Sequence, residues 1–446
     1  MERIKPRTLS GFMELLPPKQ AQMRAVMKVL RETYALYGFT PIDTPVIEAA
    51  EVLLAKGGGE TEKQIYRFTK GDSDLALRFD LTVPLAKYVA LNYGQLAFPF
   101  RRYQIGKVYR GERAQRGRFR EFYQADIDVI GDGSLDVSNE AEMPAIICEA
   151  FRRLGIERFR IRMNNRKVLN GLFQYLGVSD DASAVMTAID KLDKIGAEKV
   201  AAILTDDIGM DPEKARELMS ILSAEDPMAT LDGLAGRCGA LDEGIAELRT
   251  VVGLLPGLGV PDDKWEIDLT IARGLDYYTG TVYETMLLDH PEVGSVCSGG
   301  RYDDLAGYYT DRKLPGVGVS IGVTRLFYIL QEQGLLNEAL DTAPCDALVI
   351  PMGDTMAYAV RCATELRARG VRTQVYNEKK KVKAKFSYAD RLSIPWAVVV
   401  GEDEAASGAV SLKELATGEQ TTLSAAEAAE IILKKIDRDI KPVKGI

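Results

Sequence analysis

Apolar and polar residues alternate along two neighbouring stretches within residues 98–130, FPFRRYQIGKVYRGERAQRGRFREFYQADIDVI. Alternation with a period of two is typical of strands that bury one face. On the second stretch the apolar set is Tyr123, Ala125, Ile127 and Val129, and the opposite set is Phe122, Gln124, Asp126 and Asp128. The pattern predicts a hairpin with one face in the core, while the other presents an aromatic ring, an amide and two carboxylates.

Arginines crowd the turn of this hairpin at residues 111–117; they are Arg110, Arg113, Arg116, Arg118 and Arg120. A guanidinium group offers a planar fork of donors that binds phosphate or carboxylate through two hydrogen bonds. Together with the acidic face of the strand, the hairpin could hold a molecule with a phosphate chain and a cationic or amine end. A hairpin with a solvated polar face is the alternative that this segment alone leaves open.

Upstream of the hairpin the pattern predicts a helix followed by an extended segment. Apolar residues at helical spacing mark residues 21–38 as an amphipathic helix that ends at a glycine. In the extended segment 39–48, Pro41 and Pro45 exclude a central position in a sheet. We therefore expect an edge strand, a loop or an interface strand there.

A strand-to-helix corner is predicted next. Residues 75–80 alternate as a strand, and a helix through Asn92 follows them. Thr82 stands at the expected N-cap, with Pro84 near the first turn. Asp80 and Thr82 thus lie at a corner where ligand-binding groups are often found. A plain helix cap explains both residues equally well.

The middle of the chain changes from strands to helices and back. Residues 157–163 read as a strand, whereas residues 165–256 read as short helices broken by glycine and proline. We interpret the latter range as an inserted helical domain. Strand character returns at residues 265–271, and ARGLDYYTGTVYETMLL follows at once. We expect Arg273 and Gly274 at a turn, and Tyr277 and Tyr278 at the start of the next strand.

Two glycine-containing stretches come next. In GSVCSGGRY, residues 294–302, the paired glycines either let the backbone approach a ligand closely or form a hairpin turn. GVGVSIGVTRL, residues 316–326, predicts a strand that enters a helix with Arg325 in its first turn. That arginine either caps a phosphate or lies on the surface. The spacing GxGxxxG is not the dinucleotide fingerprint, and the sequence contains no P-loop.

The C-terminal part alternates between strands and helices. Strands are expected at residues 347–351, 371–376 and 396–400, with an amphipathic helix at 355–369. The fully apolar strands indicate a separate three-layer α/β unit with buried parallel strands. Its charged run EKKKVKAK, residues 378–385, leads into a helix and is typical of a solvated surface.

Composition narrows the classes of function. The 446 residues are enough for about two or three domains. The net charge of −8 argues against indiscriminate polyanion binding, so any nucleic-acid contact must come from local basic patches. Five scattered cysteines without CxxC spacing suit a reducing cytosol, and no stretch resembles a signal peptide or a membrane span.

A single histidine, His290, excludes any metal site built from several histidines. Counting alone leaves a Cys297–His290 nucleophile pair open. The plainer reading of Cys297 is a buried thiol within a strand.

These motifs together resemble the class II aminoacyl-tRNA synthetases, and within them the histidyl-tRNA synthetases. TPVIE with the preceding helix is similar to motif 1, YRGERAQRGRFREFYQADIDVIG to motif 2, and GVGVSIGVTRL to motif 3. More specific are RGLDYYTG and SGGRYDDL, which resemble the two histidine-specific signatures of the family. RFDLTVPLAKY resembles the family's Asp-Leu-Thr segment, and KAKFSYAD with VVVGEDE is similar to its anticodon-binding domain.

The resemblance implies an α+β catalytic core, in which helices flank an antiparallel sheet, with a helical insertion and a C-terminal three-layer α/β domain. The core would span residues 1–164 and 257–335, the insertion residues 165–256, and the anticodon-binding-like domain residues 343–446. It implies an ATP-dependent ligase that converts L-histidine to histidyl-adenylate and then transfers histidine to the terminal adenosine of tRNA(His). A cytoplasmic homodimer that uses Mg²⁺, without membrane attachment, is expected.

Roles in the site also follow from the resemblance. Arg273 would be the catalytic cation, and Arg110 would bridge the α-phosphate of ATP and the histidine carboxylate. Histidine-binding residues would be Asp80, Thr82, Arg110, Gln124, Asp128, Arg273, Tyr277 and Tyr278; ATP-binding residues would be Arg110, Glu112, Arg118, Phe122 and Arg325. No metal ligand is assigned from the sequence.

Two departures and one rival accompany the resemblance. Thr324 stands where the family usually has an acid before the motif 3 arginine, and SGFMELLPP only approximates the family's opening segment. The rival is a regulatory histidine-binding subunit of ATP phosphoribosyltransferase. Such paralogues typically lack the anticodon domain and the complete histidine signatures, both of which are present here.

Overall fold

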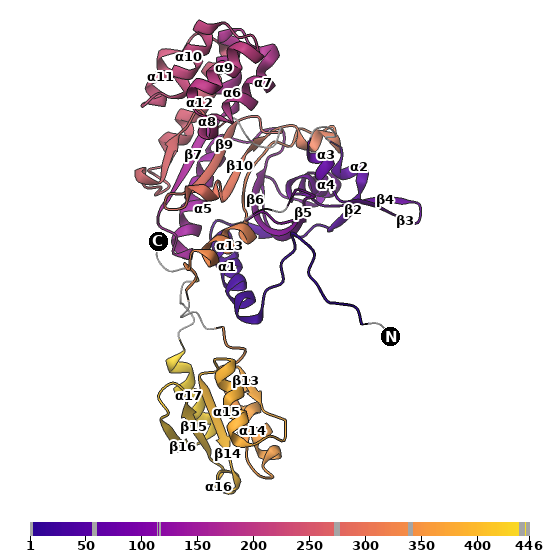
Figure 1. The fold of residues 1–446 in the computed structure, drawn as a ribbon, viewed down its shortest axis with the longest axis vertical. Coiled ribbons are helices and arrows are strands. Elements are labelled where there is room, and N and C mark those ends of the chain that lie inside the picture. Colours follow the sequence, from indigo (N-terminus) through magenta and orange to yellow (C-terminus); the bar gives the residue numbers. More distant parts are fainter. Residues whose placement is uncertain are drawn as a thin grey trace. The chain divides into compact units, whose positions relative to one another are not determined.

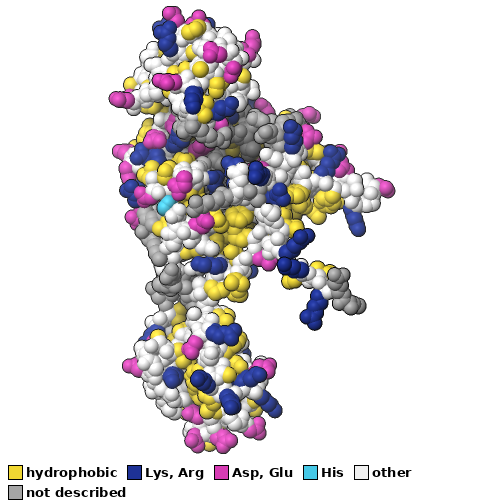
Figure 2. Space-filling model, in the orientation of Figure 1, with side chains coloured by type: hydrophobic (Ala, Val, Ile, Leu, Met, Phe, Trp, Pro, Cys, Tyr) yellow, Lys and Arg dark blue, Asp and Glu magenta, His cyan; other side chains and the backbone are white. Residues whose placement is uncertain are grey.

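The computed structural model describes residues 3–55, 60–113, 115, 117–271, 277–337, 342–436 and 442. Its contacts divide the chain into a large unit, formed mostly by Arg24–Leu336, and a smaller one, formed mostly by Asn337–Pro442. Acidic and basic side chains are interspersed over the visible faces (Figure 2), as a modest net charge predicts.

An eight-stranded sheet forms the centre of the large unit (Figure 1), in the order β1-β5-β6-β11-β10-β9-β7-β8. The strands are β1 (Thr40–Pro41), β5 (Phe100–Tyr109), β6 (Glu121–Ile130), β7 (Phe159–Asn165), β8 (Trp265–Ile267), β9 (Thr281–Leu287), β10 (Cys297–Tyr302) and β11 (Gly316–Ile321). The outermost pairs, β1–β5 and β7–β8, are parallel and the others are antiparallel. The predicted antiparallel core is confirmed, and proline-containing β1 lies at an edge.

The hairpin predicted from alternation is β5–β6. Its register pairs Arg102 with Asp128 and Gly106 with Gln124. Ala125, like the other aliphatic residues of its face, is fully buried. The prediction of a core face and an acidic face on this strand is therefore correct.

Three helices pack against the sheet: α1 (Pro17–Leu36), α5 (Ser138–Leu154) and α13 (Val323–Glu332) (Figure 1). The Tyr34 hydroxyl of α1 donates to the Ala125 carbonyl of β6 at 3.4 Å, and its ring lies 5.8 Å from that of Tyr103. Tyr37, just after α1, reaches the Ala145 carbonyl of α5 at 3.5 Å. This side of the sheet is thereby filled, which leaves the acidic face of β6 for a ligand.

A small three-stranded sheet, ordered β2-β4-β3, precedes the hairpin. Its strands are β2 (Ile47–Ala49), β3 (Arg67–Lys70) and β4 (Ser73–Leu77), and the neighbouring helices are α2 (Ala50–Leu53), α3 (Glu60–Gln64) and α4 (Thr82–Asn92). The strand ends at Leu77 instead of Asp80, and Thr82 is the first helical residue, so its predicted N-cap role is wrong. Leu81 is the N-cap residue, and the carboxylate of Asp80 just before it accepts the Val83 N–H of the first turn at 3.1 Å.

The described elements between β7 and β8 are helical. They are α6 (Arg166–Leu176), α7 (Ala182–Ile189), α8 (Leu192–Ile195), α9 (Ala197–Ala202), the π-helix η3 (Ile203–Asp207), α10 (Pro212–Leu222), α11 (Pro227–Gly233) and α12 (Gly239–Leu254). Short 3-10 turns are η1 (Tyr93–Gln95), η2 (Ser179–Asp181), η4 (Asp262–Lys264), η5 (Pro291–Val293) and η6 (Leu305–Tyr308). These helices belong to the same compact unit as the sheet, and the predicted domain limits at residues 165 and 256 stay a prediction.

Two glycines let α6 and α12 approach closely. A Cβ on Gly171 would lie 2.5 Å from the Leu241 backbone nitrogen, and a Cβ on Gly244 would lie 2.6 Å from that of Val168. Because these atoms are backbone, no side-chain movement could make room. The close packing of α6 against α12 therefore requires glycine at both positions.

The C-terminal unit is a five-stranded sheet in the order β13-β12-β14-β15-β16. Its elements are β12 (Ala347–Pro351), α14 (Met356–Ala368), β13 (Thr373–Val375), α15 (Val382–Arg391), β14 (Trp396–Val400), α16 (Glu402–Ser407), β15 (Val410–Glu414), β16 (Gln420–Leu423) and α17 (Ala425–Lys435). Strands β13, β12 and β14 are parallel, and β15 and β16 are antiparallel additions.

Two apolar clusters cover the two faces of this sheet. Val349 packs in the cluster that contains residues of α14 and α17, whereas its neighbour Leu348 packs in the cluster that contains Ala389 of α15. The predicted three-layer α/β unit is therefore correct. Lys385 departs from the expectation of a solvated charge run, because it is buried and its Nζ donates to the Pro351 carbonyl at 2.6 Å.

Candidate active site

A cavity of about 450 Å³ lies over the acidic face of β6. The structure brings together in its lining the following residues predicted from the sequence: Asp80, Thr82, Arg110, Glu112, Arg118, Phe122, Gln124, Asp128, Tyr277, Tyr278 and Arg325. They come from the start of α4, the β5–β6 hairpin, the segment before β9, and α13. Arg273 lies outside the described residues.

Asp128 is held by a buried arginine and a tyrosine. Arg102 Nη2 lies 2.5 Å from Asp128 Oδ2, with the two side chains 0% and 4% exposed. The Tyr302 hydroxyl donates to Asp128 Oδ1 at 2.6 Å. Gly318 on the neighbouring strand leaves the necessary space, since a Cβ there would lie 2.2 Å from Asp128 Oδ1. The carboxylate is thereby fixed in one orientation at the floor of the cavity.

A second polar chain runs beside it. Gln124 Nε2 donates to Ser320 Oγ at 2.6 Å, and Ser320 Oγ donates to Asp126 Oδ1 at 2.5 Å. Both Asp126 and Ser320 line the cavity, yet the sequence analysis gave neither a role. Asp126 lies on the predicted acidic face and could have been included. The place of Ser320 in the site could not be predicted, because it depends on the β6–β11 register, which pairs Ser320 with Asp126.

Burial shifts the protonation of the acidic end. Desolvation raises the pKa of Asp80 to about 7, against the lowering effects of the Val83 N–H and Arg110. Desolvation also raises the pKa of Asp128 to about 7, with Arg102 opposing it, and raises the pKa of Asp126. Asp80 Oδ2 is buried and has no hydrogen-bond partner among the described residues. Buried carboxyls in this condition are suited to receive a cationic group, which would restore their charged forms.

Three arginines, Arg110, Arg118 and Arg325, line the same cavity and form what we call its basic end. Arg110 Nε donates to the Phe79 carbonyl at 3.0 Å, and its guanidinium carbon lies 5.2 Å from the centre of the Phe122 ring. Arg118 Nη1 lies 3.5 Å from Glu112 Oε2. These groups can bind phosphate oxygens and stack against a flat ring.

Arg325 lies in the first turn of α13 and lines the same cavity. Its Nη1 donates to the Ser295 carbonyl at 2.9 Å, and its Nη2 donates to the Val293 carbonyl. Burial lowers the pKa of Arg325, and Arg118 lowers it further, whereas Glu112 and Glu284 raise it. A polyanion that entered this end would relieve the repulsion between the two arginines.

Tyr277 and Tyr278 form an aromatic wall with Tyr302. The Tyr277 ring centre lies 5.0 Å from that of Tyr278 and 5.8 Å from that of Tyr302. The prediction that these tyrosines begin a strand is wrong, because β9 starts at Thr281. The paired glycines of SGGRY lie within β10 and do not form a turn. Gly299 lines the cavity, and the close approach of these glycines to a ligand stays a prediction.

Cys297 is buried in β10, and burial raises the pKa of its thiol. A nucleophilic cysteine needs the thiolate, which this environment disfavours. The buried-thiol reading of Cys297 therefore fits the structure better than a nucleophile.

A family model described as "Histidyl-tRNA synthetase" matches residues 11–326. The chain belongs to the histidyl-tRNA synthetase family. A second model, "Anticodon binding domain", matches residues 346–435, which cover the sheet of the C-terminal unit.

Relatives and solved structures agree with this assignment. The chain is 52% identical to a histidine–tRNA ligase from Clostridium tetani, over 96% of this chain and 98% of the relative. A histidyl-tRNA synthetase structure from Nostoc sp. PCC 7120 is 41% identical with a TM-score of 0.88, over 97% of this chain and all of that one.

A third match, from Bacillus halodurans, is a structure described as an ATP phosphoribosyltransferase regulatory subunit/histidyl-tRNA synthetase. It has a TM-score of 0.73 over 90% of this chain and 99% of that one. At 22% identity it shares the fold alone.

Within this family the departure at Thr324 now has a structural account. The Tyr123 N–H of β6 donates to Thr324 Oγ1 at 2.7 Å. Pairing between β6 and β11 ends at Ala125 and Ile321, so this N–H lies beyond the ladder. The threonine hydroxyl satisfies it and ties the start of α13, with Arg325, to the hairpin.

Proposed function

We propose that this chain, like other members of the histidyl-tRNA synthetase family, is a histidine–tRNA ligase. It activates L-histidine with ATP to histidyl-adenylate and pyrophosphate, and then transfers histidine to the 3′-terminal adenosine of tRNA(His). The observation that carries the proposal is one cavity with a buried acidic and phenolic end and an arginine-lined end. An amino acid and a nucleotide triphosphate bound side by side require these two chemistries.

The acidic end is assigned to histidine. Asp80, Thr82 and Gln124 receive the α-amino group, for which the unpartnered Asp80 Oδ2 is suited. Asp128 and Tyr278 contact the imidazole, with Tyr277 completing the wall. A pocket built from hydrogen-bonding groups rejects ligands without matching polarity by about 10⁴–10⁵-fold. No editing step is then needed.

The basic end is assigned to ATP. Arg118 and Arg325 hold the terminal phosphates, while Glu112 and Phe122 contact the adenine. Arg110 bridges the α-phosphate and the histidine carboxylate, since it lines the cavity and its Nε is already fixed by the Phe79 carbonyl. Arg273, placed from the sequence alone, is the second catalytic cation.

The chemistry needs alignment and charge stabilisation. A carboxylate oxygen of histidine attacks the α-phosphorus, a new P–O bond forms, and the bond to the leaving pyrophosphate breaks. The nucleophile is already ionised, so no general base is required. Arg110 and Arg273 offset the negative charge that accumulates on the α-phosphate oxygens.

Magnesium is the expected cofactor. Bound Mg²⁺ would offset phosphate charge; it prefers one or two carboxylates together with substrate phosphates. Glu284 lines the cavity and acts electrostatically on Arg325, so it is the candidate to hold the ion. No cluster of three or more acidic, histidine or cysteine ligands occurs among the described residues, which fits an ion held mainly through the nucleotide.

We also propose a cytoplasmic homodimer that reads tRNA(His) with its C-terminal unit. The motif 1-like segment carries large apolar side chains that stay exposed in the single chain, among them Leu36, Val46 and Ile47. Exposed apolar patches of this kind are often covered by a partner. Within the part of the chain that the structure describes, no helix has the length and apolar character needed to span a bilayer.

Histidine-dependent exchange of pyrophosphate into ATP tests the proposed activity. We expect exchange by the intact protein and a large loss in Arg273→Ala. An intact protein that binds histidine but gives no exchange would contradict the ligase. That outcome would favour the regulatory subunit of ATP phosphoribosyltransferase.

Asp80→Asn should separate stability from activity. The pKa of Asp80 is raised to about 7 in the folded protein. The contribution of this carboxyl to the free energy of unfolding therefore falls as the pH rises from about 4 to 7. The asparagine, which can still accept the Val83 N–H, should therefore unfold at a higher temperature than the parent at pH 8, with the gap closing near pH 4. Its kcat/KM for histidine in the exchange assay should fall by about 10²-fold at pH 8, because the charge facing the α-ammonium group is gone.

The surface variant Asp74→Asn serves as its control and should leave kcat/KM for histidine unchanged. In the parent, kcat/KM should decline as the pH falls through 7, and Asp80→Asn should flatten this decline relative to the parent at each pH. An unchanged kcat/KM in Asp80→Asn would remove Asp80 from the histidine site.

A further inference from the structure

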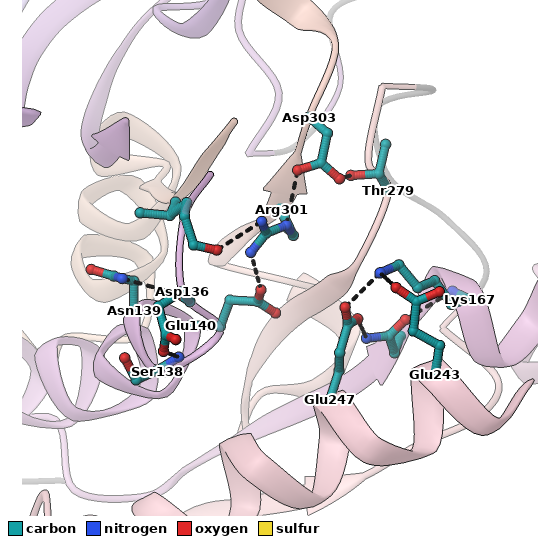
Figure 3. A network of polar contacts seen from close by, with 12 residues as sticks. Asp136, Ser138, Asn139, Glu140, Lys167, Glu243, Glu247, Thr279, Arg301 and Asp303 are labelled. Carbon is teal, nitrogen blue, oxygen red and sulfur yellow. Dashed lines mark hydrogen bonds and ion pairs between the residues drawn. The ribbon is translucent and has the colours of Figure 1, made fainter. Parts of the chain in front are cut away.

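A polar network is centred on Arg301 of β10 (Figure 3). Arg301 Nη1 donates to Glu140 Oε1 of α5 at 2.7 Å, and Nη2 donates to the Leu135 carbonyl at 2.9 Å. Its Nε donates to Asp303 Oδ1 at 3.0 Å. All three nitrogens of the guanidinium thus donate hydrogen bonds within the protein.

Arg301 points away from the ligand cavity. Its neighbour Tyr302 lines the cavity, whereas Arg301 is absent from the lining, as alternation along a strand requires. Its partner Glu140 is 0% exposed and Arg301 itself is 9% exposed. An arginine within a histidine signature is therefore held where it cannot contact histidine or ATP.

The network continues to the segment that precedes β9. Thr279 Oγ1 donates to Asp303 Oδ2 at 2.6 Å, as Figure 3 shows, and the Thr279 N–H donates to the Arg301 carbonyl at 2.8 Å. Gly280 passes over the arginine stem so closely that a Cβ would lie 2.8 Å from Arg301 Cδ. The segment is held through backbone, side chain and close packing at once.

This segment carries the tyrosine wall. Tyr278 directly precedes Thr279, and its ring lies against β10, where a Cβ on Gly300 would be 3.0 Å from Tyr278 Cδ1. Tyr277 packs edge-on against Tyr302. Any shift of Thr279 would therefore move both tyrosines relative to Asp128, which Tyr302 holds.

We propose that Arg301, Asp303 and Thr279 are positioning residues that set the width of the histidine subsite by fixing Tyr277 and Tyr278. The inference rests on the proposed function. We expect the network to act on histidine and not on ATP, because the described part of the segment, residues 277–280, lines the cavity only through Tyr277 and Tyr278. Side chains that support a binding group typically need to hold it to within about 0.5 Å.

Thr279→Val tests the link with a nearly isosteric change that removes the hydroxyl donor to Asp303. In the pyrophosphate exchange assay we expect the KM for histidine to rise about 10-fold, corresponding to about 1.4 kcal/mol. The KM for ATP and kcat should change less than about 2-fold, since alignment at the phosphates is untouched. Thr279→Ser, which keeps the hydroxyl, should restore the KM for histidine to that of the parent.

Arg101→Met is the matched control. It breaks another ion pair between the sheet and the same helix α5, Arg101 Nη2 to Glu142 Oε2 at 2.7 Å, and a contact of Arg101 with the Phe39 ring. We expect it to lower the unfolding temperature without changing the KM for histidine. A similar rise of this KM in Arg101→Met would show general loosening of the fold and overturn the proposal.

The outcomes separate this inference from the proposed function. Exchange by the parent with an unchanged KM for histidine in Thr279→Val overturns the positioning role alone. An equal rise of the KM for ATP also overturns it. Absence of exchange in the parent overturns the proposed function. In that case, histidine is titrated by calorimetry into the parent and into Thr279→Val, which tests the positioning role independently of activity. Equal affinities for histidine would count against the positioning role.

Discussion

Arg110→Ala should lower histidine-dependent pyrophosphate exchange by about 10²–10³-fold, the usual loss on removing one preorganised donor from a transition state. Arg110 lines the cavity together with Asp80 and the terminal-phosphate arginines, and its Nε is anchored on the Phe79 carbonyl at 3.0 Å. The rest of its guanidinium can therefore bind without reorganisation. The loss should fall mainly on kcat, because negative charge on the α-phosphate grows as the transition state is reached.

Arg110→Lys should keep the positive charge but lose the two parallel hydrogen bonds of the guanidinium. Its exchange rate should therefore lie between those of the parent and Arg110→Ala. Lys107→Met is the matched control on strand β5, which Arg110 directly follows, since Lys107 pairs with Glu121 at 2.7 Å and does not line the cavity. It should exchange pyrophosphate at the parental rate. If Arg110→Ala kept the parental kcat, the assignment of Arg110 to the reacting phosphate would be wrong.

Arg102→Met should destabilise the large unit by about 3–5 kcal/mol, because it leaves Asp128 buried without its cation. The two side chains are almost fully inaccessible and their atoms are 2.5 Å apart. Loss of Arg102 removes an effect that lowers the pKa of Asp128, which then rises further above about 7. A buried carboxyl with a raised pKa destabilises the folded protein as the pH rises. The loss of stability in Arg102→Met relative to the parent should therefore be larger at pH 8 than at pH 5.

Thermal unfolding of the full chain at both pH values measures this effect. The double variant Arg102→Met/Asp128→Leu should recover most of the lost stability, since it removes both charges. Histidine binding measured by calorimetry should be abolished in it, because Asp128 is gone. A double variant no more stable than Arg102→Met would show that shape, and not an uncompensated charge, explains the loss. Arg101→Met, on the next residue of the same strand, controls for the loss of a partly exposed arginine.

The large features of the fold follow from local patterns. Alternation along residues 121–130 predicted a strand with a core face and an acidic face, and the apolar runs at 347–351 and 396–400 predicted buried parallel strands. Such patterns are reliable because side-chain direction within a strand alternates whatever its neighbours are. The predicted site residues that the structure describes likewise line the cavity, but so do Asp126 and Ser320, to which the sequence motifs assigned no role; Arg273 lies outside the described residues.

Local patterns failed at the junctions between elements. Thr82 had the right residue type and position for a cap, yet the Asp80 carboxylate accepts the Val83 N–H instead. Tyr277 and Tyr278 have strand propensity, but Thr279 is bonded to the 301–303 segment, and regular pairing begins only at Thr281. Long-range hydrogen bonds outweigh intrinsic preferences at such places.

The sequence by itself determined the alternating faces of the strands, the arginines of the hairpin turn and the acids that line the cavity. Only the tertiary structure decided which charges meet. The hairpin register pairs Arg102 with Asp128, and the pairing of β10 directs Arg301 toward Glu140 and away from the cavity. Burial then sets the protonation of the acids, because desolvation depends on every element that packs around a side chain and on no single stretch of sequence.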